Sequence, residues 1–426
     1  MTRGSRPDET LDRMMAAWFE ERAHGDHADA VIDAALARTS RQRPLPTWRL
    51  PERWIPDWRG TPFLPDVRLG PVLLIGLLVL LAAALLVVVG SQRHTPPSFG
   101  VAVNGLIAYD TFDKIYVANG DGTGVMPLVT GIPNAAAATW SPDGTRLAFW
   151  GDDSPDSLYV INADGTGIRK VAGDLWIGTD KPPAWSPDSR SIVFSSESGA
   201  DRRDEGLYMV DVSAATVVRL GDPTTIPVRA LFPAWSPDGA WIAFEGVPTS
   251  GAGDPELWIV RPSGLEARKL PTSKLLGDFA GPRWAPTTDR SVIAYAAKTA
   301  SGGRHDLFLF DVDVDVDAAR ETVILASPED KRWPAWSPDA TRLAWLVGAS
   351  PMSLKVASID DMADQTTFPI AGVGAPPAWS PDGVTVYGSD AGKRTVIVIA
   401  VDGTSSPVRI DHPGGQGPPT WQRRAP

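Results

Sequence analysis

The sequence has no cysteine and only five histidines among its 426 residues. Without cysteine the chain can form no disulfide, no thiolate metal site and no thiol-based active site. His24 and His27 stand close together, but a zinc site needs further ligands, so we expect no bound metal and no cofactor. The chain also lacks the G-x-S-x-G motif of a nucleophile elbow. We therefore expect no catalytic residues and a protein that is not an enzyme.

An excess of positive charge is missing as well. The net charge is −11, and residues 1–69 contain as many basic as acidic residues, so the whole acidic excess lies beyond them. A broad surface for nucleic acid needs clustered lysine and arginine. We therefore expect no nucleic-acid partner.

The acidic excess includes one run, DVDVDVD at residues 311–317. A calcium loop needs a sharp turn that glycine permits, and this run has no glycine. Alternation of valine and aspartate instead favours a strand that continues into an exposed hairpin, with valine inward and aspartate outward. We expect a structural role for this run and no metal site.

One long segment without charge, GPVLLIGLLVLLAAALLVVVG, occupies residues 70–90. About 20 apolar residues in helical form span a bilayer, and the segment lies too far from the N-terminus for a cleaved signal peptide. Arg53, Arg59 and Arg68 precede it, whereas only Arg93 follows closely. Because basic residues stay inside, we expect a single-pass protein of the cell membrane with a cytoplasmic N-terminus.

The cytoplasmic segment, residues 1–69, is expected to contain two short helices, near residues 8–23 and 28–39, followed by a juxtamembrane linker rich in Pro, Arg and Trp. Residues 91–99 form a second linker outside the membrane. This layout resembles that of transmembrane anti-sigma factors, although the zinc-binding His and Cys pattern many of them carry is missing. The resemblance implies a possible cytoplasmic regulator as partner.

Beyond the membrane segment a motif repeats: ATWSPDGTRLAFW, PAWSPDSRSIVFS, PAWSPDGAWIAFE and three further variants, ending in PTWQ. The repeated tryptophans are separated by 42 to 52 residues. They are Trp140, Trp185, Trp235, Trp284, Trp336, Trp379 and Trp421. A period in the forties with short β-rich runs is typical of a propeller blade of four strands. In the unit that begins with Ala184 and Trp185, we expect strands at 184–185, 191–195, 207–210 and 216–220. The equivalent tryptophans are expected to pack in the core between blades.

The two ends of the repeat region complement each other. GLIAY at residues 105–109 is the first segment that fits the second strand of a blade, and no first strand with a motif tryptophan precedes it. Trp421 belongs to a first strand that no second strand follows. We therefore expect an all-β, seven-bladed propeller in which the C-terminal strand joins the N-terminal three and leaves no free edge. A six-bladed ring with one degenerate unit is the alternative.

The WSPDG strand and turn, followed by LYVINADGTG at residues 158–167 or IYVANGDGTG at 115–124, resemble the bacterial TolB-like propeller repeat. The resemblance covers residues 100–426. It implies a propeller fold strongly and a function weakly. TolB is a soluble, partner-binding protein of the periplasm, and related propellers precede hydrolase domains in some serine peptidases.

We name the four strands of a blade A to D in the order of the chain. Binding is expected on the face formed by the B–C and D–A connections. These connections are long and varied, whereas the A–B and C–D turns are short and repetitive. Aromatic and basic side chains supply most interface energy. The candidates for binding a protein, peptide or envelope ligand are Trp176, Arg202, Arg203, Arg229, Phe232, Arg304, His305, Lys331, Arg332 and Trp333. The expected function is a non-catalytic, membrane-anchored binding module. The alternatives are a signalling protein with the propeller as sensor, or a hydrolase or lyase with its site in the propeller funnel.

Overall fold

The computed structural model describes most of the chain beyond residue 98. The described residues are 99–111, 114–152, 156–175, 181–196, 205–249, 254–272, 275–276, 281–298, 303–313, 320–348, 352–369, 376–390, 395–403, 406–411 and 419–425. These residues form strands and turns and contain no helix, and so no helix able to cross a membrane. The predicted membrane segment 70–90, the helices expected within 1–69 and residues 91–98 of the linker lie outside them.

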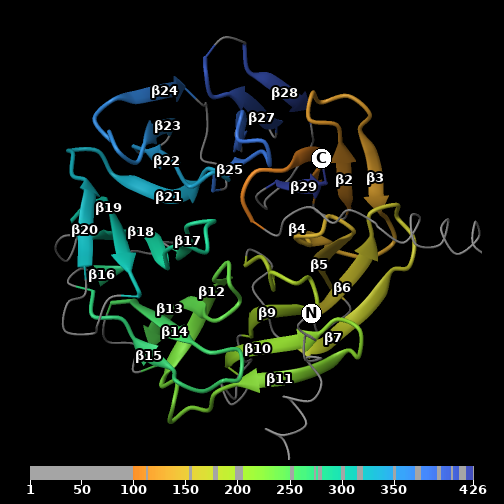
Figure 1. The fold of residues 1–426 in the computed structure, drawn as a ribbon. Helices are drawn as coiled ribbons and strands as arrows, with labels where there is room; N and C mark the ends of the chain where they lie inside the picture. The colour runs from red at the N-terminus through yellow and green to blue at the C-terminus, as the bar shows by residue number, and fades with distance from the viewer. Residues whose placement is uncertain are drawn as a thin grey trace, which may run out of the picture. The chain divides into compact units, whose positions relative to one another are not determined.

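Seven antiparallel sheets are arranged in a circle, as the blades of a propeller (Figure 1). Strand A of each blade lies nearest the centre and strand D at the rim. The A strands are β4 (Ala136–Trp140), β8 (Ala184–Trp185), β12 (Val228–Trp235), β17 (Arg283–Trp284), β21 (Lys331–Trp336), β25 (Ala378–Trp379) and β29 (Thr420–Arg424). The B strands are β1 (Val103–Asp110), β5 (Arg146–Asp152), β9 (Ser191–Ser196), β13 (Ile242–Pro248), β18 (Val292–Lys298), β22 (Arg342–Val347) and β26 (Thr385–Asp390).

The outer half of each blade is equally regular. The C strands are β2 (Ile115–Ala118), β6 (Asp156–Asn162), β10 (Gly206–Asp211), β14 (Glu256–Val260), β19 (His305–Asp311), β23 (Ser353–Ser358) and β27 (Thr395–Ala400). The D strands are β3 (Met126–Val129), β7 (Arg169–Leu175), β11 (Thr216–Leu220), β15 (Arg268–Lys269), β20 (Arg320–Leu325), β24 (Gln365–Pro369) and β28 (Val408–Asp411). The blades are numbered along the chain, so that blade one is the sheet β29-β1-β2-β3, blade two is β4 to β7 and blade seven is β25 to β28. Blade five has one additional short strand, β16 (Leu275–Leu276), which pairs with β18 beyond the end of β17.

The ring closes by pairing the last strand with the first. β29 is antiparallel to β1, with Trp421 opposite Ile107 and Arg424 opposite Val103. Gln422 secures this junction, because its Oε1 accepts from the Leu106 backbone N–H at 3.1 Å and its Nε2 donates to the Gly144 carbonyl at 2.7 Å. The predicted seven blades and strand closure are confirmed, and the six-bladed alternative is wrong.

The hydrophobic core is divided among the seven boundaries between neighbouring blades. At the boundary of blades two and three, Trp185 packs with Ala148 and Trp150 of the preceding blade. Trp150 also meets Phe194 edge-to-face, with ring centroids 5.6 Å apart. Fully burying one such side chain contributes roughly 1.5–3 kcal/mol. The expected packing of the repeated tryptophans between blades is confirmed.

An S-P-D turn joins strands A and B in five of the seven blades, after Trp140, Trp185, Trp235, Trp336 and Trp379. In blade three the Ser186 hydroxyl donates to the Asp188 carboxylate at 2.6 Å and accepts from the Ser191 backbone N–H at 2.9 Å. The turn ends in a left-handed residue, which is Gly383 at φ 72° in blade seven but Ala340 at φ 58° in blade six. The repeated serine and aspartate therefore have a structural role, because they hold the turn between strands A and B in place.

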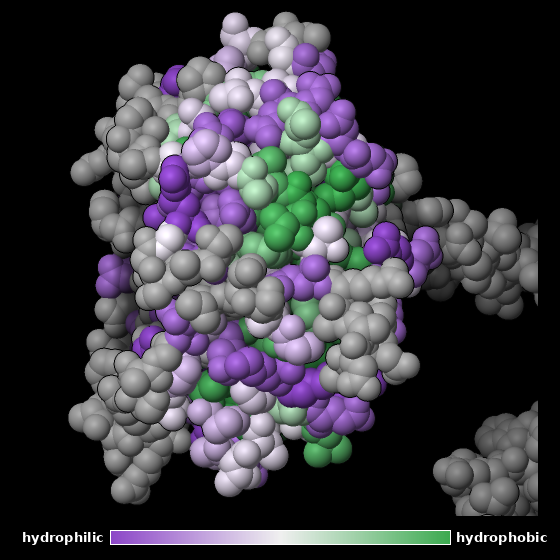
Figure 2. Space-filling model, turned by 90° about the vertical axis from the view of Figure 1, so that its left-hand side faces the viewer, coloured by the Kyte–Doolittle hydropathy of each residue, from purple (hydrophilic) through white to green (hydrophobic). Residues whose placement is uncertain are grey.

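The described outer surface is mixed in character. Figure 2 views the side of the propeller that carries β18 to β21, and hydrophilic residues cover much of what is described there, beside one hydrophobic patch. Val323 of β20, 46% exposed, is among the large apolar side chains that reach solvent.

Candidate functional site

The chain enters the propeller on the face of the A–B turns. The Ala102 backbone N–H donates to the Pro381 carbonyl at 2.8 Å, and the Asn104 side chain donates to the Asp382 carboxylate at 2.7 Å. Pro381 and Asp382 belong to the S-P-D turn of blade seven. Of the residues that the structure describes at the entry, Ala102 and Asn104 thus contact the A–B-turn face.

Two A strands reach further toward the opposite face, formed by the B–C and D–A connections, than the two-residue A strands of their neighbours. β12 and β21 each contain a β-bulge, between Leu231 and Ala234 and between Arg332 and Ala335. The bulges place Phe232 at φ 50° and Trp333 at φ 54°, both three residues before the motif tryptophan. Left-handed backbone is rare for bulky residues, and such outliers cluster at functional sites.

Beside Trp333 an acidic residue organises several basic ones. Asp330 accepts from the His305 backbone N–H at 2.9 Å and contacts His305 Nδ1 at 2.7 Å. Arg332 donates to the other oxygen of the same carboxylate at 2.9 Å. Burial acts to raise the pKa of Asp330, but these hydrogen bonds and the nearby His305 outweigh it and lower the pKa below its usual value. The carboxylate thus fixes Arg332, whose side chain is 37% exposed.

Lys331 is placed differently from its neighbour Arg332. Its side chain is fully buried, and its ammonium group donates to Asp306 at 2.7 Å and to the Glu329 carbonyl at 2.9 Å. His305 is also buried, at 6% exposure. Both residues support the first residues of β19 and β21 from inside, and they do not offer a surface that a partner could touch.

The other predicted residues are spread over the molecule. Arg229 lies partly buried on β12, and Arg304 is exposed and donates to the Pro328 carbonyl. The structure therefore brings together Arg304, His305, Lys331, Arg332 and Trp333 around the starts of β19 and β21. Arg229 and Phe232 lie on β12, one blade from β19 and two blades from β21. The remaining candidates lie outside the described residues. They are Trp176, Arg202 and Arg203.

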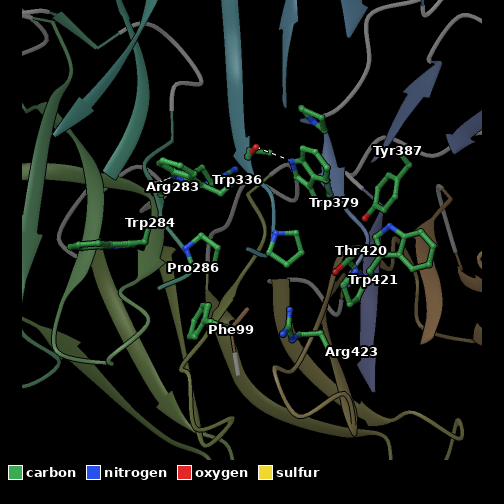
Figure 3. Close-up of a pocket in the computed structure, with 15 residues that line it drawn as sticks. Phe99, Arg283, Trp284, Pro286, Trp336, Trp379, Tyr387, Thr420, Trp421 and Arg423 are labelled. Atoms are coloured by element: carbon green, nitrogen blue, oxygen red, sulfur yellow. Dashed lines mark hydrogen bonds between the residues drawn. The ribbon is translucent and has the colours of Figure 1, made fainter. Parts of the chain in front are cut away.

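The channel at the centre contains a hollow of about 350 Å³. It is lined by A strands of blades five, six, seven and one and by the A–B turns of blades five, six and seven, so it lies toward the A–B-turn end and not at the expected funnel on the opposite face. Figure 3 shows Arg283, Trp336 and Trp379 on one side of the hollow and Phe99 with Arg423 on the other. Phe99, predicted as the last linker residue, thus borders the channel.

The two arginines of the hollow were not among the sequence-based candidates. Burial lowers the pKa of Arg283, and it lowers that of Arg423 to about 10. A signal for Arg283 was present in the repeat, because the residue before the motif tryptophan is Ala or Thr in six units and Arg only in PRW at 282–284. Arg423 follows the last motif, where no repeat remains for comparison.

The acidic run at 311–317 continues from strand C, as predicted, for the three residues that are described. Val312 is buried, whereas Asp313 is exposed and accepts from the Ser291 backbone N–H at 2.9 Å. Across the described residues, no group of three or more His, Asp or Glu side chains is placed to hold a metal ion.

The repeat, the closure and the turn chemistry agree with one protein family. Residues 113–308 match the family model described as the TolB beta propeller domain. This stretch is a TolB-type propeller domain. No curated protein sequence matches the chain. The TolB-like resemblance of the repeat is thereby confirmed for the fold, and the TolB-type match itself names no active site.

Solved structures share the fold at low identity. Hydrazine synthase from Kuenenia stuttgartiensis is 14% identical, with a TM-score of 0.54 over 73% of this chain and 97% of that one. A puromycin hydrolase S511A mutant complexed with PGG is 17% identical, with a TM-score of 0.54 over 76% and 54%. TolB from Acinetobacter baumannii is 15% identical, with a TM-score of 0.48 over 74% and 81%. At these identities the first two structures establish the propeller fold alone.

Proposed function

We propose that this protein is a membrane-anchored, extracytoplasmic binding module without catalytic activity, which recognises a protein partner through the B–C/D–A face of its propeller. The uncharged segment 70–90 supports the anchor. The TolB-type domain supports a protein as the partner.

The observation that carries the proposal is the pair of aromatic residues in left-handed backbone on β12 and β21. A bulky residue at φ near 50° is strained, and the bulge that imposes it interrupts strand pairing. The short A strands β8 and β25 have only two residues. The longer strand β4 has the same bulge, with Ala137 at φ 51° three residues before Trp140. What distinguishes β12 and β21 is that a bulky aromatic residue, Phe232 or Trp333, stands where β4 has alanine, and this choice of residue supports a ligand that meets these side chains.

The charges around Trp333 fit the same role. Arg332 is held by Asp330, so part of the entropy that binding would cost has already been lost in the folded protein. Arg304 is exposed beside it. Aromatic and arginine anchors that are fixed before binding are the residues that dominate interface energies. Their positive charge favours a partner surface with acidic side chains.

Affinity capture of the full-length protein from native membranes tests the proposal. Trp333→Ala and Phe232→Ala are each expected to reduce capture of the envelope partner about 30-fold, the effect of roughly 2 kcal/mol at an interface anchor. Leu265→Ala is the matched control, since Leu265 is 68% exposed on a C–D turn, which belongs to the opposite face.

Undiminished capture by both aromatic variants, with loss only in the Leu265→Ala control, would place the interface on the other face and refute the proposal. A partner that is lost when residues 1–69 are deleted, but is kept by both aromatic variants, would favour the signalling alternative instead.

A further inference from the structure

The inner wall of the channel has one exceptional residue. In the A strands, the residue before each motif tryptophan is small in six of the seven blades and charged in one. The residues are Thr139, Ala184, Ala234, Arg283, Ala335, Ala378 and Thr420. Small side chains at this position allow seven A strands to meet around the axis, so the arginine of blade five introduces a long cation that the fold does not require.

Arg283 has no acidic partner. No carboxylate of any described residue forms an ion pair with it, and its one hydrogen bond as a donor runs from Nη1 to the Pro282 carbonyl at 3.2 Å. Arg283 is half-buried at the wall of the hollow, and desolvation by the surrounding protein lowers its pKa. A cation that is partly removed from water and has no counter-charge among the described residues loses hydration without compensation. A bound anion would offset that loss.

The hollow beside Arg283 has the size and chemistry of a ligand site. Its volume of about 350 Å³ lies within the range of small-molecule pockets, roughly 300–1,000 Å³. Its lining includes Trp284, Trp336 and Trp379 with several prolines, and it contains no Asp or Glu. A second guanidinium, that of Arg423, lines the same space and donates to the Gly100 carbonyl at 2.6 Å. The walls are therefore flat and apolar, and the charge within is positive.

We propose that the central hollow binds a small organic oxyanion, a carboxylate or phosphate carried on a flat apolar body, with Arg283 as the anion-binding residue. The planar guanidinium matches both oxyanions with paired hydrogen bonds. The tryptophan and proline walls suit the apolar body. This site is separate from the proposed partner face and does not depend on it.

Isothermal titration calorimetry of the full-length protein in a non-ionic detergent tests the proposal with three probes: phenylacetate, phenyl phosphate and the uncharged phenylacetamide. We expect at least one anion to bind at millimolar concentration or below, and the amide to bind at least tenfold more weakly. Whichever anion binds more tightly identifies the class of oxyanion, and either result supports the site.

Arg283→Ala is the decisive variant, because alanine already occupies this position in four blades. It should weaken anion binding about tenfold or more, since hydrogen bonds to charged groups are the strong ones. Arg290→Ala is the charge-matched control in the same blade. Arg290 is 71% exposed and is not among the residues that line the hollow, so its loss should leave binding unchanged.

Thermal unfolding distinguishes a ligand-binding arginine from a structural one. Without ligand, Arg283→Ala should unfold at the same temperature as the wild type or above it, because an unpaired charge has been removed. Three results would each overturn the proposal: no binding of either anion by the wild type, equal binding by Arg283→Ala, or a clear drop in its unfolding temperature.

Discussion

Asp330 shows how a single carboxylate can organise a cluster of basic residues. It receives hydrogen bonds from the His305 backbone and from Arg332, and its own backbone carbonyl accepts from the Gly348 N–H at 3.0 Å. The residue thereby links the first residue of β19 to the start of β21. Its depressed pKa records how strongly the folded state favours the charged form.

Asp330→Asn should destabilise the protein at pH 7 by about 1–3 kcal/mol, because an amide cannot replace both charge-assisted contacts. For a group with a depressed folded pKa, stability is present above the unfolded pKa and is lost as the pH falls through the folded pKa. The wild type should therefore lose stability below about pH 4, and the variant should lose less over the same interval. Urea unfolding at several pH values measures both.

The exposed Asp360 provides the control for this prediction. Asp360→Asn removes the same charge from a position without a side-chain partner among the described residues. A variant at Asp330 that behaves as the Asp360 variant does would show that the cluster contributes nothing to stability.

At the scale of elements, neighbouring A strands are joined by side chains as well as by packing. The indole N–H of Trp284 donates to the Ala234 carbonyl of the preceding blade at 3.1 Å. Trp185, Trp336 and Trp379 donate in the same way across their own boundaries. The indole of Trp235 is equally buried but has no acceptor among the residues that the structure describes. The repeat thus places a tryptophan indole at every boundary between blades, whereas the indole forms a hydrogen bond at only some of these boundaries.

Replacing tryptophan by phenylalanine separates these two contributions. Trp284→Phe and Trp235→Phe lose similar apolar area, since the residues are 7% and 8% exposed. Only the first also removes a hydrogen bond, so it should cost about 1 kcal/mol more in the free energy of unfolding. Denaturant titration followed by circular dichroism provides the comparison, and equal costs would show that the inter-blade hydrogen bond has no net value.

At the scale of the whole molecule, closure depends on residues far apart in the sequence. Gln422 is 5% exposed and joins β29 both to β1 and to the turn of blade two. Gly144 lies against the Arg423 carbonyl so closely that a Cβ there would be 1.9 Å from the oxygen. The junction therefore tolerates little change on either side.

Gln422→Leu should destabilise the protein by about 2–4 kcal/mol, because it leaves one buried N–H and one buried carbonyl without partners. Gln365→Leu is the matched control: its side chain donates only to the Met362 carbonyl within its own blade, and its cost should stay below about 1 kcal/mol. Urea unfolding monitored by tryptophan fluorescence measures both. Similar values for the two variants would mean that closure adds no stability of its own.

The fold was largely predictable because the repeat carries it. In blade three the expected strands at 184–185 and 216–220 coincide with β8 and β11, since alternating apolar residues and S-P-D turns set their limits. The unpaired GLIAY segment and Trp421 predicted the closing pair for the same reason. Local sequence patterns and one unmatched strand at each end of the repeat region were sufficient to predict the fold.

The candidate sites were less predictable. The left-handed backbone at Phe232 and Trp333 arises from bulges, which depend on pairing with β13 and β22 and leave no mark in the local sequence. Lys331 was expected among the partner-binding residues of a connection, but its ammonium group lies inside, where it donates to Asp306, 25 positions away. Arg283 could have been found by comparing the units column by column, because it replaces a small residue.

The pairing of β29 with β1 also determines when the ring can close during synthesis. Val103 and Thr420 are 317 positions apart, and the ribosome needs roughly 15–60 s to translate that stretch at bacterial or eukaryotic elongation rates. Throughout that interval the first blade lacks its innermost strand, and the exposed backbone edge of β1 can recruit any other strand that is available. The nascent chain should therefore need protection by a chaperone until β29 has been made.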